Sequence, residues 1–255
     1  MDQETLNKFV DFYDDFKYAT ENIDDESRGI LRSEAFFVGA LCGHNPERII
    51  ESGRARGQST YLLAKSLPNT KIISIEYDKD SSDSNFALER LSGCENVKCL
   101  FGDSRKLIPE LVQNGDILLI DGPKDMDALI LIYKISKFAN ISKAFVHDAY
   151  NGSKLRKWLS FFKPNCICSD SSKFLQKYCH LDNHLVKGDL INCENNICFS
   201  TEKIYGGTFV YIDRNNLCFS IIELLSIYFL RSYFKIIRST FKRLGLNYLE
   251  PQPCE

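Results

Sequence analysis

Four short apolar segments of the chain each end in, or run directly into, an acidic residue. The first ends in Glu51, the second in Glu76, the third in Gly102-Asp103 and the fourth in Asp121. If these segments are parallel strands, their carboxyl ends share the sheet edge at which open α/β folds bind ligands. A carboxylate there can accept both hydroxyls of a ribose, and another can accept an adenine amino group. One such acid is commonly a helix cap or turn former, but four in succession favour a nucleoside site.

Two glycines follow the first of these acids. Residues 48–60, RIIESGRARGQST, are typical of a strand, a loop and the start of a helix. Glycine allows positive φ angles and close approach of a ligand, and the amides at a helix N-terminus favour an anionic group. We therefore expect Gly53 and Gly57 to form a ligand cradle. The spacing differs from the Gly-x-Gly-x-x-Gly of dinucleotide-binding folds, because Ala55 stands at the middle position.

The residues around these positions predict that strands and helices alternate. Apolar segments without polar alternation are expected for strands buried on both faces, and five are present, at 48–51, 71–76, 97–101, 116–121 and 143–147. Apolar residues at three- and four-residue spacing predict helices between them, at 59–66, 84–91, 104–111 and 126–138. Such alternation implies a mostly parallel sheet with helices on both faces and right-handed crossovers.

Both ends of the chain are predicted to be helical. The spacing of apolar residues indicates two helices between residues 4 and 42, with a break at 22–27, and a further helical region from residue 217 onward. Beyond Asn151 the alternation weakens, and strand-like pieces remain at 196–200 and 208–212. We expect three parts: residues 1–45 as an N-terminal helical cap over the ligand edge, 46–213 as an α/β domain, and 214–255 as a basic amphipathic helical extension.

Composition narrows the class of protein. The 255 residues carry a formal net charge of −2, which argues against a surface wholly devoted to nucleic acid. Ten cysteines without an N-terminal signal sequence indicate free thiols in a reducing cytoplasm. No apolar run reaches the roughly 18 residues that a membrane-spanning helix needs, since the longest candidate, 217–230, is interrupted by Glu223. We therefore expect a cytoplasmic enzyme or binding protein.

Taken in order, these motifs resemble those of class I S-adenosylmethionine-dependent methyltransferases. The resemblance spans about 100 residues, from Arg48 to Asp148, and its motifs are Glu51-x-Gly53-x-x-x-Gly57, Glu76, Gly102-Asp103 and the apolar strand that ends in Asp121. It implies a Rossmann-like fold and S-adenosylmethionine as cofactor. It further implies that the cofactor is bound by seven residues: Glu51, Gly53, Gly57, Glu76, Asp103, Ser104 and Asp121.

The roles of the two arginines in the glycine loop remain open. Arg54 and Arg56 either face the methionine carboxylate of the cofactor or are simply solvated.

Residues that follow the fourth and fifth strands are candidates for the chemistry. Asp121 and Asp148 are placed like the carboxylates with which metal-dependent O-methyltransferases bind a divalent cation such as Mg²⁺, although Ala149 stands where those families often have another oxygen ligand. The alternative without a metal uses His147 or Asp148 as general base and Lys124 as an electrostatic or proton-transfer partner. Asp148 serves both mechanisms.

The Cys-rich segment and the basic C-terminal helix each have a structural and a functional interpretation. The Cys-rich segment 166–198 contains Cys166, Cys168, Cys179, His180, His184, Cys193 and Cys198 but no Cys-x-x-Cys pair, which disfavours structural zinc. Arg231, Lys235, Arg238 and Lys242 recur at helical spacing beside an apolar stripe. This helix either packs on the body of the protein or contacts a membrane surface, an acidic partner or a second copy in a homodimer.

The predicted function is transfer of a methyl group from S-adenosylmethionine to a hydroxyl of a small molecule or glycan. A nucleic-acid acceptor is not expected, because Asp121-Gly-Pro-Lys stands where amino-directed enzymes carry an Asn/Asp-Pro-Pro-Tyr loop. The alternatives are a non-methylating enzyme on the same fold and a binding or scaffold protein recruited to a membrane or partner through its C-terminal helix.

Overall fold

A computed structural model describes residues 1–24, 29–43, 45–150, 152–182 and 209–243, with the side chains at 234, 235 and 237–243 left out. The predicted strand at 196–200, together with His184, Cys193 and Cys198, lies outside these residues.

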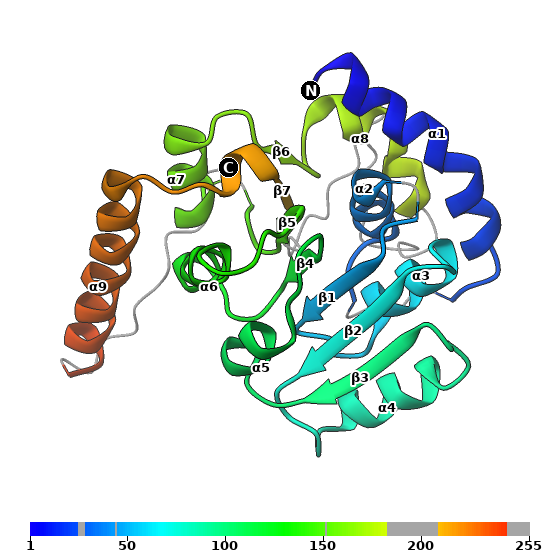
Figure 1. The fold of residues 1–255 in the computed structure, drawn as a ribbon, viewed down its shortest axis with the longest axis horizontal. Coiled ribbons are helices and arrows are strands. Elements are labelled where there is room, and N and C mark those ends of the chain that lie inside the picture. Colours follow the sequence, from blue (N-terminus) through cyan, green and yellow to red (C-terminus); the bar gives the residue numbers. More distant parts are fainter. Residues whose placement is uncertain (25–28, 44, 151, 183–208, 244–255) are drawn as a thin grey trace.

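A single sheet organises the described chain (Figure 1), and its strands run in the order β3-β2-β1-β4-β5-β7-β6. The strands are β1 (Arg48–Ser52), β2 (Lys71–Glu76), β3 (Val97–Phe101), β4 (Ile117–Ile120), β5 (Lys143–Val146), β6 (Ile167–Cys168) and β7 (Val210–Asp213). The first five are parallel to one another, and β7 is antiparallel to both β5 and β6. The predicted mostly parallel sheet is confirmed. From β1 the chain proceeds to β2 and β3 on one side and resumes with β4 on the other, which makes the β1/β4 boundary the switch point of the topology.

Side chains of the central strands point alternately into two apolar layers. Ile49 lies in one layer and Ile50 in the other, and Leu119 and Leu118 of the neighbouring strand divide in the same way. One layer contains side chains of α1 (Gln3–Thr20), α2 (Arg32–Cys42), α3 (Gln58–Ser66), α4 (Ser82–Leu91) and α8 (Ser172–Tyr178). The other contains side chains of α5 (Ser104–Leu111), α6 (Met126–Ser136), α7 (Lys154–Phe162) and α9 (Ile221–Arg243). Burial on both faces explains why these strands are apolar throughout.

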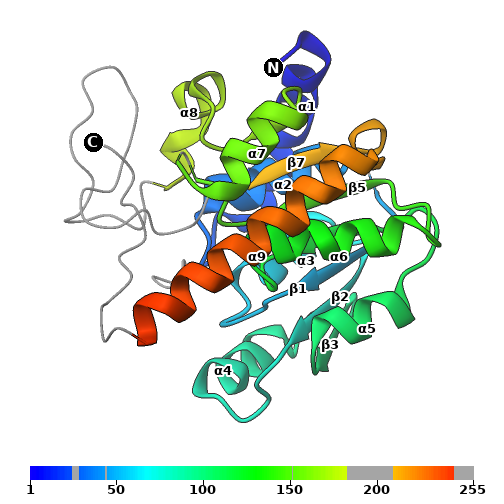
Figure 2. The ribbon, with the colours of Figure 1, turned by 90° about the vertical axis from the view of Figure 1, so that its left-hand side faces the viewer.

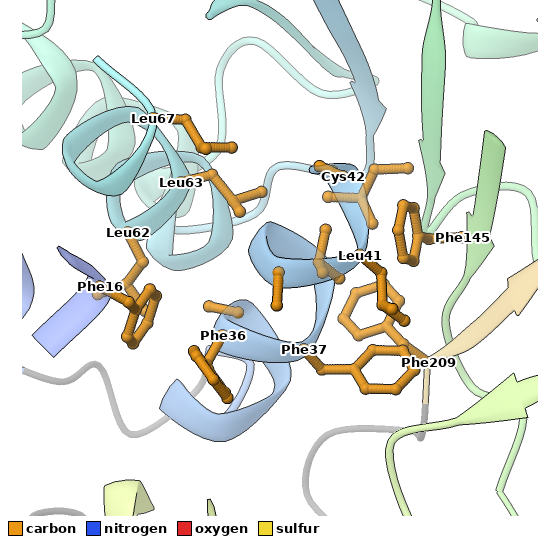
Figure 3. Close-up of a cluster of buried hydrophobic side chains, with 14 of the residues drawn as sticks. Phe16, Phe36, Phe37, Leu41, Cys42, Leu62, Leu63, Leu67, Phe145 and Phe209 are labelled. Atoms are coloured by element: carbon orange, nitrogen blue, oxygen red, sulfur yellow. The ribbon is translucent and has the colours of Figure 1, made fainter. Parts of the chain in front are cut away.

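Helix α2 is buried over its whole length, because α1, α3 and the turn at Cys179–Asp182 pack against it and its apolar side chains share a core with β1, β4 and β5. Its Phe36 contacts the rings of Phe9, Phe16 and Tyr178. Phe37 reaches Phe145 of β5 (Figure 3). The N-terminal helices therefore share one continuous core with α3 and the sheet.

Two regions differ from the sequence expectations. Between residues 154 and 178 the structure has α7, the two-residue strand β6 and α8, none of which was predicted. The signal for α7 was present, since Leu155, Trp158 and Leu159 are its buried residues at helical spacing. Strand β6 is too short to leave a pattern. The predicted helix from residue 217 begins later, at Ile221, after a 3₁₀ turn at Arg214–Leu217.

Membrane-spanning segments were sought among the described helices, and none is both long and apolar enough to cross a bilayer.

The ring cluster around Phe36 predicts a large stability effect. Replacing Phe36, which is fully buried, by Ala removes ring contacts and leaves a cavity, so we expect the free energy of unfolding to fall by about 3–5 kcal/mol. Urea unfolding followed by circular dichroism measures this change. The matched control is Phe138→Ala, since Phe138 is 60% exposed and should change the unfolding free energy by less than about 0.5 kcal/mol. Equal effects of the two substitutions would contradict the assignment of this core.

Candidate active site at the carboxyl edge of the sheet

The loops after β1 and β4 touch each other at the switch point. Gly53 has a φ of +85°, and a Cβ there would lie 3.1 Å from the backbone carbon and Cβ of Asp121 and the nitrogen of Gly122. The Gly53 amide also donates a hydrogen bond of 3.0 Å to the carbonyl of Ile75 in β2. Gly57, with a φ of +76°, is the N-cap residue that precedes α3. Both conditions that call for glycine, a left-handed backbone and close approach, are met at Gly53.

An open pocket of about 220 Å³ lies at this edge. Four of the predicted cofactor residues, Gly53, Glu76, Asp103 and Ser104, form part of its wall. The remaining wall comes from residues that the sequence analysis did not select: Ile75, Tyr77, Gly102, Arg105, Gly122 and Pro123. Each of these lies within two residues of a predicted site residue, so the acids at the strand ends locate the pocket but do not identify all of its lining.

The carboxylate of Glu76 is held by backbone amides. One oxygen accepts a hydrogen bond of 2.7 Å from the amide of Ala55, and the other accepts one of 2.7 Å from the amide of Tyr77. A carboxylate offers about four acceptor positions, so two remain for a ligand. Glu76 is thus fixed in orientation and still able to accept hydroxyl groups at the pocket wall.

Asp103 and Ser104 connect the pocket to α5 and to the loop after β4. Asp103 caps α5 and accepts hydrogen bonds from the backbone amide of Arg105 at 3.0 Å and from its guanidinium at 2.8 and 2.9 Å. The hydrogen bonds from the Arg105 side chain lower the pKa of Asp103. Ser104 Oγ donates to the carbonyl of Gly122 at 2.9 Å. Arg105 therefore already engages the carboxylate of Asp103, one of the predicted cofactor-binding residues.

Glu51 lies beneath the loop and is absent from the pocket wall. Its carboxylate is 1% exposed and accepts hydrogen bonds from the hydroxyls of Ser59, Thr60 and Ser74. Burial raises the pKa of Glu51, although the three hydroxyls act in the opposite direction. This residue ties the end of β1 to the first turn of α3 and to β2.

Neither loop arginine is simply solvated. Arg54 is 2% exposed, donates to the carbonyl of Ser74 at 2.8 Å and lies 4.7 Å above the ring of Phe101. Arg56 lies 4.1 Å above the ring of Phe86 and forms an ion pair of 3.3 Å with Asp83. Both side chains contact neighbouring elements, and neither belongs to the pocket wall.

The predicted catalytic residues come together in one charged network. The ammonium of Lys124 contacts Asp121 Oδ1 and lies 2.6 Å from Asp148 Oδ2. Nδ1 of His147 is 2.7 Å from Asp121 Oδ1 and 3.5 Å from Asp148 Oδ1. We call these four residues the Lys124 network.

The charges of this network support one another. Burial by itself lowers the pKa of Lys124 and of His147, but the neighbouring carboxylates outweigh it and raise both pKa values. Burial also pushes the pKa of Asp121 upward, yet the hydrogen bond and charge of His147 and the charge of Lys124 bring it below its usual value. The network therefore favours an ammonium and an imidazolium paired with carboxylates.

This donor set does not fit Mg²⁺, the cation that the sequence analysis suggested. Asp121, His147 and Asp148 bring one ligand atom each to within 4.8 Å of one another. Lys124, however, contacts both carboxylates, and Mg²⁺ prefers an octahedron of oxygen ligands to an imidazole that favours its charged form. Ala149 is fully buried and adds no side-chain oxygen. An ammonium thus bridges the two carboxylates predicted as metal ligands.

The Cys-rich segment does not form a metal-binding group within the described chain. Cys166 and Cys168 are free thiols. Among the described residues, no set of side chains close enough to share an ion includes Cys166, Cys168, Cys179 or His180.

A buried glutamate of α2, which the sequence analysis did not select, approaches the network from the N-terminal helices. Glu34 is 4% exposed, its Oε2 accepts a hydrogen bond of 2.9 Å from the amide of Leu31, and its Oε1 lies 4.0 Å from Nε2 of His147. Burial raises the pKa of Glu34 to about 8. The sequence carried no clear signal for Glu34, because Leu31 has no side-chain oxygen to complete the capping box of which Glu34 would be one half.

Comparison with known proteins gives structural likeness only. No protein-family model and no curated protein sequence matches the chain. Among solved structures, it is similar to the O-methyltransferase TomG from Streptomyces achromogenes in complex with SAM, with 16% identity over 84% of this chain and 91% of that one and a TM-score of 0.45. It is also similar to an O-methyltransferase from Bacillus cereus in complex with SAH (13% identity, 81% and 90% of the two chains, TM-score 0.45) and to fibrillarin from Aeropyrum pernix (15%, 66% and 66%, TM-score 0.38).

The order and direction of the strands, with helices on both faces, decide the architecture. The chain has a Rossmann-like fold, in which helices cover both faces of a mostly parallel sheet. In this fold the pocket and the Lys124 network lie at the carboxyl ends of adjacent parallel strands.

The buried carboxyl of Glu34 predicts a pH-dependent stability. Its pKa of about 8 lies above the ordinary value of 4.5, so the stability that it contributes is complete below about pH 4.5 and is lost as pH rises through 8. Glu34→Gln keeps an acceptor for the Leu31 amide and cannot ionise. Relative to the wild type, we expect the variant to gain on the order of 4 kcal/mol in unfolding free energy between pH 5 and 9, because about three pH units of the shift fall in this range.

Urea unfolding at a series of pH values measures this difference. Glu110→Gln, at an exposed position of α5, is the control and should follow the wild-type profile. If the wild type and Glu34→Gln lose stability in parallel, Glu34 does not titrate in this range.

Proposed function

We propose that the protein transfers a methyl group from S-adenosylmethionine to a hydroxyl of a small molecule or glycan. One observation carries the proposal: Gly122 and Pro123 line a pocket that also presents the Glu76 carboxylate, and the next residue, Lys124, holds Asp148. A site for a nucleoside and a group able to act on a hydroxyl are therefore adjacent along the chain.

The pocket residues suit the nucleoside part of the cofactor. Glu76 has free acceptor positions for a ribose diol, and Gly53 leaves space where any side chain would meet the loop after β4. Tyr77, which is 74% exposed at the pocket wall, offers a ring face for a base. When bound, S-adenosylmethionine supplies an electrophilic methyl group on a positively charged sulfur.

In the proposed reaction Asp148 accepts the proton of the acceptor hydroxyl. The hydroxyl oxygen then forms a bond to the methyl carbon while the carbon–sulfur bond breaks. The electron pair of the broken bond stays on the sulfur of S-adenosylhomocysteine. Lys124, an ammonium between two carboxylates, stabilises the negative charge that develops on the acceptor oxygen. Positioning of the two reactants supplies much of the remaining rate enhancement.

His147 is better placed to position the network than to act as base. It is 6% exposed, Nδ1 faces Asp121, and Nε2 is buried on the side of Glu34. The side chain of Asp148 is 37% exposed and so can meet an acceptor. We therefore propose that Asp148 accepts the hydroxyl proton and that His147 orients Asp121.

Loss of the Glu76 carboxylate should weaken cofactor binding. We expect Glu76→Ala to weaken binding of S-adenosylmethionine and S-adenosylhomocysteine about 10–100-fold, because two charge-assisted hydrogen bonds to the ribose would be lost. Isothermal titration calorimetry measures both affinities, with NAD as a negative control ligand. Exposed Glu89, on α4, provides the matched variant Glu89→Ala, which should bind like the wild type. Absence of binding by the wild type to either sulfur nucleoside would refute the proposal.

The Lys124 network predicts an activity that does not depend on a divalent cation. With a panel of hydroxylated acceptors, Lys124→Met and Asp148→Asn should each lower kcat for S-adenosylhomocysteine formation by about 10²–10³-fold and leave the cofactor affinity within about threefold. EDTA treatment should leave the wild-type rate unchanged. A rate that is abolished by EDTA and restored by Mg²⁺ would assign the carboxylates to a metal after all.

A further inference from the structure

Helix α9 is fixed to the body of the protein along one side. Ile227 is fully buried, Trp158 Nε1 donates to Ser226 Oγ at 2.7 Å, and Glu223 forms an ion pair of 2.8 Å with Lys163. Arg231 is paired with Asp127 of α6. Figure 2 shows α9 lying across the outside of α6.

The opposite side of α9 presents large apolar side chains to solvent. Ile222, Leu225, Phe229, Tyr233 and Ile236 are each between 49% and 71% exposed, and Ile221 beside them is 76% exposed. We call the first five residues the α9 stripe. It contains no charged residue.

The spacing of the α9 stripe is symmetric about its centre. Relative to Phe229, the other four residues stand at −7, −4, +4 and +7. At about 3.6 residues per turn, all five fall within roughly 80° of the helix circumference. An isologous two-fold contact brings the same patch of two subunits together, and two antiparallel helices with this spacing match residue for residue. Phe229 then meets itself, Leu225 meets Tyr233, and Ile222 meets Ile236.

The area of this face is suited to a dimer contact. With side chains of roughly 150–250 Å² each, the observed exposures leave an apolar face on the order of 700 Å². The largest apolar patch of a typical monomer is about 300–600 Å², whereas a stable interface buries about 800 Å² on each partner.

We propose that the α9 stripe is a homodimer contact, in which α9 of one subunit packs antiparallel against α9 of a second copy of this chain. The contact lies on the outer side of α9, and its opposite side is the one that packs on the protein. It requires no residue of the pocket or of the Lys124 network, so it is independent of the proposed function.

The position of the basic residues disfavours a lipid surface as the occupant. Positions 235, 238 and 242 lie, by helical register, on the side of α9 turned away from the stripe, and among the basic positions of α9 only 243, its last residue, follows the register of the stripe. A bilayer in contact with the stripe would be about one helix diameter, or ~10 Å, from them, which is close to the Debye length at physiological salt. Arg231 already has an acidic partner in Asp127.

Mass measurement tests the proposal on the full chain. In sedimentation velocity over about a hundredfold range of concentration, we expect the wild type to form a dimer. Leu225→Glu and Phe229→Glu should each shift it to the monomer, because they would bury unpaired charges at the contact. The matched control is Phe161→Glu on α7, where Phe161 is 77% exposed and outside the stripe. It should remain dimeric, and circular dichroism should show all the variants folded.

The antiparallel arrangement has its own test. A benzoylphenylalanine placed at position 229 should, on illumination, cross-link to the second copy within residues 225–233, as read by mass spectrometry. A wild type that stays monomeric throughout, a dimer that survives both stripe substitutions, or cross-links outside α9 would overturn the proposal. Flotation of a monomeric wild type with phosphatidylserine vesicles, lost in Leu225→Glu, would overturn it in favour of a lipid surface.

Discussion

The close approach of the loops after β1 and β4 is the constraint on which the rest of the site depends. Gly53 is in a left-handed conformation. A Cβ at this position would lie only 3.1 Å from backbone atoms of Asp121 and Gly122. Any larger residue would separate the two loops at the switch point, where the topology leaves room for a ligand. Because Gly53 also binds Ile75 through its amide, this contact positions the start of α3, the end of β2 and the Asp121 loop relative to one another. The buried carboxylate of Glu51 accepts hydrogen bonds from three hydroxyls of α3 and β2. It therefore holds the end of β1 against both elements.

The Lys124 network follows from the register of β4 and β5. These strands are parallel, with Ile120 beside Val146, so the next residues of each strand, Asp121 and His147, emerge side by side at the same edge. Two carboxylates in a partly buried place would repel each other, and a single ammonium between them removes that cost. Lys124 can reach both because its loop begins at Asp121. The same arrangement leaves little reason for a divalent ion, since its role in neutralising the carboxylates is already filled by a residue of the chain.

Sequence patterns predicted the strands that are buried on both faces and the helices between them. Of the site, they predicted only the residues that directly follow a strand. The five parallel strands, the helices between them and residues such as Glu76 and Asp103 follow from local pattern and from the rule that parallel strands end at one edge. Glu34 could not be placed in this way, because its nearness to His147 depends on how α2 packs against the sheet. The buried position of Arg54 was missed for a similar reason, since its partners are a carbonyl of β2 and a ring of β3. Contacts between segments far apart in the sequence determine the positions of both Glu34 and Arg54.

The backbone at Asp148 shows how the fold aims its proposed base. Asp148 has a φ of +60°, a left-handed conformation that costs most residues about 1–2 kcal/mol and that Asp tolerates better than most. It is needed because the chain must leave β5 at His147, which is buried, and return at once with Ala149, which is fully buried as well. An extended residue between them would continue the strand, whereas the left-handed turn directs the carboxylate sideways to Lys124 and leaves it partly exposed. The strain is offset by the two buried neighbours and by the ion pair, so the base is oriented before any acceptor arrives. Such prior orientation is what a reaction that relies on positioning requires.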